Sequence, residues 1–227
     1  MTCYDHTQAS RNVSMAASVA ITRFTDPKEY EFIIVDTEPK YRFNYKPPVP
    51  VGTAPVKIDK FLELTPDLGY FASMNRGAEE AKGEYLCFIE NDVFVTPEWL
   101  PNLRWYLENG YLDAVFPHQA PDSYETYLKY SKLPMEKGWN GGCEEQGLML
   151  ITREAFDKMG GWDKNFPVGI GWKNVLLQMH DSGIKFGSTF KSVISHICGM
   201  TYFNMSEFER EKFVKNTGIE AEYLLGK

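Results

Sequence analysis

The chain has 227 residues, of which 43% are hydrophobic, and a net charge of −7 at pH 7. This apolar fraction is ample for a packed core, and the length suits one large α/β domain or two small ones. The net negative charge disfavours binding of nucleic acid or of an anionic membrane by the protein surface as a whole. We also expect a cytoplasmic protein, because no apolar run is long enough to span a membrane, the first residues lack a signal-peptide pattern, and the four cysteines form no Cys-x-x-Cys pair.

The beginning of the chain predicts the opening of a parallel sheet. Residues 1–7 give a weak first strand, a helix follows from about residue 10 or 12 to Phe24, and residues 30–36 form a buried strand ending in Asp36. Strand, helix and strand in this order are typical of a parallel α/β sheet. Residues 37–57 are rich in proline and mix aromatic with basic side chains. An ordinary packed loop is favoured there over a surface that grips a sugar or a nucleic-acid strand.

The rest of the chain continues the alternation of strands and helices. A strand is expected at residues 58–64, a helix at 68–83, and an apolar strand at 85–89 that ends in Glu90-Asn91-Asp92. Residues 118–140 are a loop-rich aromatic stretch. The remaining predicted elements are helices at 97–110, 153–159, 172–182 and 206–215, and strands at 112–117, 147–152 and 192–196. These elements predict an α/β fold, doubly wound, with a mostly parallel central sheet flanked by helices.

Three polar residues, Glu90-Asn91-Asp92, close the strand at 85–89. The carboxyl ends of strands are where ligands bind to an open α/β sheet. Carboxylates at such a position suit a hard divalent cation, which takes oxygen ligands and bridges phosphates. Strands also end in Asp or Asn because these residues turn the chain. The triplet by itself therefore leaves a metal site and a simple turn equally open.

Three blocks of the sequence resemble the GT-A nucleotide-sugar glycosyltransferases, above all family 2. The first block runs from Asn75 to Asp92, the second from Gly147 to the Gly-Gly-Trp-Asp run that ends at Asp163, and the third is His196-x-x-Gly-x-Thr201. Their order and separation also match. The resemblance implies one GT-A domain over residues 1–227, with a nucleotide-binding half (1–92), an acceptor and sugar half (93–205) and a C-terminal helix (206–227). It also implies transfer of a hexose or pentose from a nucleoside-diphosphate sugar to a hydroxyl acceptor.

The resemblance implies roles for particular residues. Asp92 is expected to bind Mn²⁺ or Mg²⁺ directly, and Glu90 to reach the ribose or the hydration shell of the ion. His196 is expected to be a second metal ligand, in preference to a hydrogen-bonded core histidine. Asp36 would accept a hydrogen bond from a nucleobase, or would only turn the chain. The other positions expected to contact nucleotide or sugar are Tyr4, Asn75, Arg76, Asn91 and Trp172, with a solvated Arg76 and a core Trp172 as alternatives.

The chain departs from the family at the catalytic base, which takes the proton of the acceptor hydroxyl. Inverting members carry a Glu-Asp pair where this chain has Gly171 and Trp172. Either another carboxylate serves, or the enzyme retains anomeric configuration and needs no such base, or the protein binds nucleotide sugar or carbohydrate without catalysis. The candidate carboxylates are Glu144, Glu145 and Asp163. An active transferase is favoured, because the metal and nucleotide positions are kept.

Other features bear on substrates and partners. A sugar-phosphate nucleotidyltransferase is disfavoured, because no Gly-rich loop with basic residues follows the first strand. A glycan, a protein or a modified nucleic-acid base is the expected acceptor. The aromatic and basic residues at 41–46 keep the last of these open. No motif specifies the donor sugar, the nucleobase or an oligomeric state.

Overall fold

The computed structural model describes residues 1–3, 8–37, 56–64, 68–120, 132–141, 147–165 and 171–197, the side chains of residues 120, 140, 171 and 172 excepted. In chain order its elements are β1 (Thr2–Cys3), α1 (Gln8–Phe24), β2 (Ile33–Asp36), β3 (Lys60–Glu63), α2 (Tyr70–Glu80), β4 (Tyr85–Ile89), β5 (Val93–Val95), α3 (Trp99–Glu108), β6 (Ala114–Ala120), the 3-10 helix η1 (Met135–Lys137), β7 (Trp139–Asn140), β8 (Leu148–Thr152), α5 (Arg153–Lys158), α6 (Gly171–Asp181) and β9 (Phe186–His196).

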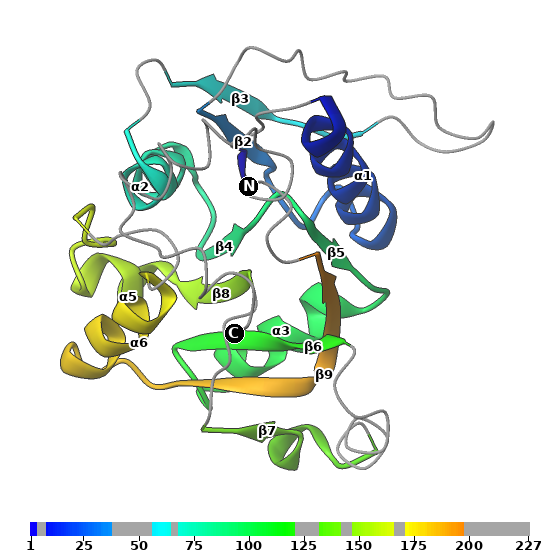
Figure 1. The fold of residues 1–227 in the computed structure, drawn as a ribbon. Helices are drawn as coiled ribbons and strands as arrows, with labels where there is room; N and C mark the ends of the chain where they lie inside the picture. The colour runs from blue at the N-terminus through cyan, green and yellow to red at the C-terminus, as the bar shows by residue number, and fades with distance from the viewer. Residues whose placement is uncertain are drawn as a thin grey trace, which may run out of the picture.

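Two sheets form the centre of the molecule (Figure 1). The first has the strand order β1-β2-β3, and the second has the order β4-β8-β6-β9-β5, with β7 paired to β9. A parallel bridge between Thr2 and Glu90 joins them, so β1 lies next to the carboxyl end of β4. Figure 1 shows α1 and α2 on opposite sides of β2. This arrangement of helices around a sheet confirms the predicted α/β fold.

The direction of the strands differs between the two sheets. The expected parallel pairing holds throughout β1-β2-β3 and for β6 with β9. In contrast, β8 runs antiparallel to both β4 and β6, and β5 runs antiparallel to β9. A short, continuous apolar run does not reveal which way a buried strand points. The second sheet therefore contains both parallel and antiparallel pairs. The sequence pattern alone could not distinguish such a sheet from a purely parallel one.

Strand β8 divides the apolar core into two parts. Leu148 and Leu150 belong to a cluster with α1 and α3, whereas Met149 and Ile151 belong to a cluster with α2, α5 and α6. Successive side chains of a strand point to opposite faces. All four side chains of this run are buried because helices cover both faces of the sheet at β8.

Several element bounds differ from those expected. Strand β9 begins at Phe186, well before the predicted start at residue 192, and the short strands β5 and β7 were not predicted. The expected helix at 206–215 and most of the proline-rich stretch 37–57 lie outside the described residues. The division into halves at residue 92 stays a prediction. Among the described helices, none has both the length and the apolar character needed to cross a membrane.

Candidate metal centre

Two carboxylates and one imidazole converge where the two sheets meet. The Nε2 atom of His196 lies 3.1 Å from Oε2 of Glu90 and 3.1 Å from Oδ1 of Asp92. One ligand atom from each residue lies within 4.8 Å of the other two. Only 8% of the Asp92 side chain and 9% of the His196 side chain are exposed, against 23% for Glu90. The cluster is thus a nearly closed set of oxygen and nitrogen donors with one more open side.

Strand pairing brings the distant histidine to the acidic triplet. Glu90 follows β4, residues 91 and 92 form a turn, and β5 begins at Val93. Strand β5 runs antiparallel to β9 with Val93 opposite His196. The amide of Ile197 also donates to the carbonyl of Asp92 at 3.1 Å. The triplet therefore forms a turn of the chain, and two of its residues, Glu90 and Asp92, also belong to the polar cluster.

Gly147 gives the imidazole the space that it occupies. Its φ angle is +64°, in the left-handed region that favours glycine. A Cβ atom at this position would lie 2.8 Å from Cε1 of His196 and 2.8 Å from Cγ2 of Val93. The Gly147 carbonyl accepts a hydrogen bond from the Glu90 amide at 2.8 Å. The residue was expected only as the start of the second sequence block, and no local signal indicated its contact with His196.

Tyr70 orients the Glu90 carboxylate. Its hydroxyl, in the first turn of α2, donates to Oε1 of Glu90 at 2.6 Å, while Oε2 faces His196. Both carboxylate oxygens are thus engaged, one by a neutral donor and one by the imidazole. Sequence reasoning missed Tyr70, because a tyrosine at a helix start is ordinary and its partner lies on another element.

The electrostatic state of Asp92 follows from its burial. Desolvation raises the pKa of the Asp92 carboxyl, the hydrogen bond and charge of His196 lower it, and the nearby Glu90 carboxylate raises it. A buried carboxylate beside a second carboxylate is stabilised by a cation. Carboxylate oxygens with one imidazole nitrogen are donors that Mn²⁺ accepts, and the carboxylates also suit Mg²⁺. The residues present therefore fit the divalent ion that the family resemblance implies.

Asp36 occupies the carboxyl end of β2 but is paired with a cation. Both of its carboxylate oxygens accept hydrogen bonds from Nη2 of Arg11, at 3.0 and 2.8 Å. The Asp36 and Arg11 side chains are 1% and 0% exposed. Sequence analysis did not select Arg11, because its position in α1 relative to β2 is set by packing. Contact of Asp36 with a nucleobase stays a prediction, and it now involves a neutralised carboxylate.

Asn75 and Arg76 both have contacts with other parts of the protein, and their expected contact with the diphosphate or sugar stays a prediction. The Asn75 amide donates to the Trp162 carbonyl at 2.8 Å and accepts from the Trp162 amide at 2.9 Å. It therefore fixes the turn that follows α5. Arg76 is 38% exposed and forms ion pairs with Glu79 and Glu80 on its own helix. Helix α2 thus presents Asn75 to the turn after α5 and Arg76 to acidic residues of its own surface.

Of the remaining predicted site residues, the structure describes Asn91 and Asp163. Asn91 donates from Nδ2 to the Ser14 hydroxyl at 2.9 Å, which ties the turn to α1. Asp163 lies exposed, and its Oδ1 accepts from the amide and the side chain of Asn165, at 2.9 Å each. A catalytic role of Asp163 stays a prediction. Outside the described residues, or with side chains that are not described, lie Tyr4, Glu144, Glu145, Trp172, Gly199 and Thr201.

Comparisons with known proteins agree with this architecture. The family model "Glycosyl transferase family 2" matches residues 60–163. No curated protein matches the chain by sequence. Among solved structures, a mannosyltransferase from Pyrobaculum calidifontis in complex with GDP-Man and Mn²⁺ gives a TM-score of 0.61 at 16% identity, over 87% of this chain and 55% of that chain.

A second solved structure is GalNAc-T7 with UDP, GalNAc and Mn²⁺. It gives a TM-score of 0.56 at 16% identity, over 78% of this chain and 39% of that chain. The chain thus spans about half the length of the first structure and less of the second. At this identity the likenesses bear on the fold. Together with the family match, they show that the chain has the GT-A fold of the family 2 glycosyltransferases.

Proposed function

We propose that the protein is a metal-dependent glycosyltransferase that moves a sugar from a nucleoside-diphosphate sugar to a hydroxyl acceptor. The observation that carries this proposal is the convergence of Glu90, Asp92 and His196 at the carboxyl edge of the sheet. Ligands of open α/β sheets bind at that edge. The match of residues 60–163 to the family 2 model and the GT-A fold support the same activity.

Asp92 and His196 would hold the ion, with Glu90 as a further carboxylate or as a contact to the ribose. A divalent ion bound there neutralises the diphosphate leaving group. Mn²⁺ is the first ion to test, because the solved mannosyltransferase and GalNAc-T7 structures both contain it. Mg²⁺ is the second ion to test. It suits the two carboxylates, but it prefers oxygen donors to an imidazole nitrogen such as that of His196.

The chain's own residues prepare the site in three ways. Tyr70 fixes one oxygen of Glu90 and leaves the other toward the cluster. Gly147 allows the His196 ring to approach the two carboxylates. The low exposure of Asp92 excludes water, and charges interact more strongly in such a medium. These features hold the donors in place before any substrate arrives.

The nucleoside would lie across β1. Thr2 of β1 pairs with Val35 on one side and Glu90 on the other, and Asp36 follows Val35 directly. Two strand spacings place Asp36 on the order of 10 Å from Glu90 along the same sheet edge. We propose that the Asp36–Arg11 pair meets the base and that the Glu90 cluster meets the ribose and diphosphate. Tyr4 beside this edge and Trp172 at the sugar keep their predicted roles as proposals.

A binding module without catalysis is the second candidate, favoured by Gly171 and Trp172 in place of the acidic pair. If the enzyme is active, Glu144, Glu145 and Asp163 stay the candidates for the base. The kind of sugar, the cytoplasmic location and the acceptor (a glycan, a protein or a modified base) also remain proposals.

A screen of nucleotide sugars for Mn²⁺-dependent hydrolysis, with NMR of the anomer released, distinguishes a transferase from a binding module. Turnover that Asp92→Asn abolishes supports the transferase. Binding of nucleoside diphosphate without turnover of any donor supports the module.

A further inference from the structure

Strand β9 is interrupted by a bulge between Thr189 and Val193. Up to the bulge β9 pairs with β6 in a constant register that ends with Pro117 opposite Thr189. The next residue of β6, His118, lies opposite Val193, so residues 190–192 of β9 have no counterpart on β6. In Figure 1, β9 runs along β6 and β7 up to this point and then turns toward β5. A bulge bends its strand and re-aims the side chains that follow it.

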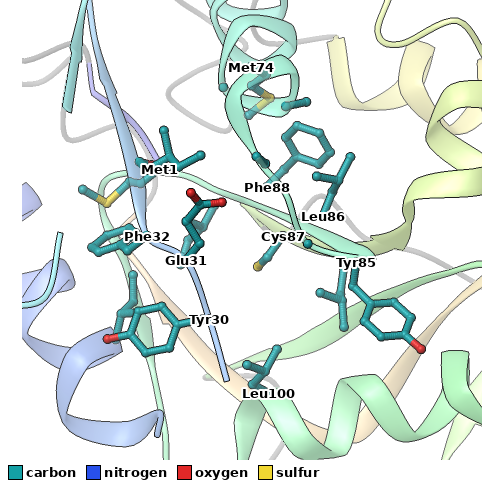
Figure 2. Close-up of a pocket in the computed structure, with 18 of the residues that line it drawn as sticks. Met1, Tyr30, Glu31, Phe32, Met74, Tyr85, Leu86, Cys87, Phe88 and Leu100 are labelled. Atoms are coloured by element: carbon teal, nitrogen blue, oxygen red, sulfur yellow. Dashed lines mark hydrogen bonds between the residues drawn. The ribbon is translucent and has the colours of Figure 1, made fainter. Parts of the chain in front are cut away.

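The bulge moves the even-numbered residues of β9 from one face of the sheet to the other. Successive side chains of a strand alternate between the faces, and Figure 2 shows this on β4, where Phe88 points toward Met74 of α2 and Cys87 points away from it. Before the bulge, Phe186 packs against the core cluster of α2, α5 and α6. After the bulge, Ile194 is buried in the cluster of α1 and α3. An odd number of extra residues has this effect because the side-chain period of a strand is two.

The change of face brings His196 to the candidate metal centre. His196 pairs with Val93, which is buried in the same cluster as Ile194. Relative to β6, an unbroken ladder would place His196 three residues farther along, about 10 Å, and on the opposite face. The 3.1 Å contacts of its Nε2 atom with Glu90 and Asp92 therefore depend on the bulge.

Buried hydrogen bonds hold the bulge in place. The Thr189 hydroxyl lies 2.9 Å from the Tyr106 hydroxyl and 2.9 Å from the Gly138 carbonyl. It also accepts a hydrogen bond from the Lys191 amide, inside the bulge, at 3.1 Å. Thr189 and Tyr106 are both fully buried. Asn102 of α3 donates from Nδ2 to the Lys191 carbonyl at 2.7 Å. The Thr189 hydroxyl thus links the bulge to α3 and to the backbone that leads into β7.

We propose that Thr189 is a positioning residue for the metal centre. Its hydroxyl fixes the bulge of β9, and the bulge sets the face and the register at which His196 reaches Glu90 and Asp92. Thr189 lies in the first half of β9 and acts through the strand, without touching the ion. The importance of this role for catalysis rests on the proposed function, whereas the position of the His196 ring can be tested in the metal-free protein.

The test compares Thr189→Val, which removes the hydroxyl, with Thr189→Ser, which keeps it. Thr25→Val is the matched control, because the buried Thr25 hydroxyl accepts a hydrogen bond from Trp99 at 2.9 Å elsewhere in the fold. In the metal-free protein, a nuclear Overhauser effect between Gly147 and the Cε1 proton of His196 reports the position of the ring, since the two residues are in close contact. Thr189→Val should lose this signal and should bind Mn²⁺ about tenfold more weakly. Thr189→Ser and Thr25→Val should keep both properties.

Two results would overturn this role of Thr189. The first is a folded Thr189→Val protein that keeps the Overhauser signal and the Mn²⁺ affinity of the parent. The second is an equal loss of both in Thr25→Val, which would make the effect one of general stability. Asn102→Ala removes a second side-chain contact to the bulge and should show the same two losses, so it decides the matter if Thr189→Val does not fold. A parent protein that binds no Mn²⁺ would overturn the proposed function, while the Overhauser signal would still decide the role of Thr189.

Discussion

The substitution Gly147→Ala tests whether the close approach of Gly147 to His196 builds the candidate metal centre. The added methyl group would lie 2.8 Å from Cε1 of His196 and 2.8 Å from Cγ2 of Val93. Neither neighbour moves easily, because the two residues face each other in the β5–β9 ladder and Val93 is fully buried. The His196 ring is expected to shift away from Asp92, so both stability and metal affinity should fall.

The size of the effect combines a backbone contribution with a steric one. A left-handed conformation costs a non-glycine residue about 1–2 kcal/mol, and overpacking of a closed site costs about 1–3 kcal/mol. Gly147→Ala should therefore lower the free energy of unfolding by roughly 2–5 kcal/mol, or Tm by about 5–15 °C. Gly160→Ala is the matched control, since Gly160 has φ of +74° and nothing lies within 4 Å of the added atom. It should show the backbone contribution alone.

Urea unfolding of both variants, together with Mn²⁺ titration by calorimetry, measures the two effects. Gly147→Ala should be less stable than Gly160→Ala by about 1–3 kcal/mol and should bind Mn²⁺ at least about tenfold more weakly. Gly160→Ala should bind Mn²⁺ as the parent does. Equal stability and equal Mn²⁺ affinity of the two variants would refute the role given to Gly147.

Three further predictions concern the residues around the site. Tyr70→Phe removes the donor to Glu90 and should weaken Mn²⁺ binding about tenfold with little change in Tm. Asp36→Ala removes the carboxylate that accepts two hydrogen bonds from the buried Arg11 side chain and should lower the free energy of unfolding by about 3–5 kcal/mol, measured by urea unfolding. Burial raises the pKa of Asp92, so in the folded protein the Asp92 carboxyl keeps its proton at pH values above the ordinary aspartate pKa. As the pH rises from the ordinary aspartate pKa through the raised pKa of Asp92, the stability of the metal-free protein should fall. Over the same pH range the Mn²⁺ affinity should rise. Thermal scans measure the first effect and calorimetry the second.

Matched variants separate these effects from general damage. Tyr111→Phe alters a tyrosine that stacks on Trp105 away from the site, and it should leave Mn²⁺ affinity unchanged. Asp92→Asn should reduce the fall in stability with rising pH, because it removes one titrating carboxyl group of the cluster. An unchanged pH dependence of stability in this variant would contradict the assignment to Asp92. An Asp36→Ala protein as stable as the parent would show that the buried pair with Arg11 is not formed.

The fold was predictable from the sequence where local patterns carry the information. Alternating apolar runs and helical periods placed β4, β8 and α3 within a few residues of their observed bounds. The parallel order of β1 to β3 followed from the strand, helix and strand at the start. The antiparallel insertion of β8 between β4 and β6 did not follow, because a run buried on both faces has the same composition in either direction.

The candidate site was predictable only in part, for a similar reason. Asp92 and His196 carry motif signals, and the structure places them 3.1 Å apart. Tyr70 and Arg11 carry no such signal, since each acts through a partner on a distant element. Asn75 also carries a motif signal, and the structure shows its side chain holding the backbone of Trp162 in the turn after α5. A motif marks the residues that recur together, whereas packing decides which of them touch.

The most direct test of the central claim is calorimetric titration of UDP and GDP into the protein, with Mn²⁺ or with EDTA. The parent and Asp157→Asn, an exposed change on α5, should bind one of the two nucleotides only when Mn²⁺ is present. Asp92→Asn and His196→Ala should lose that binding while they remain folded by circular dichroism. Equal affinity in Mn²⁺ and EDTA, or unchanged Mn²⁺-dependent binding by Asp92→Asn, would contradict a metal and nucleotide site at Glu90, Asp92 and His196.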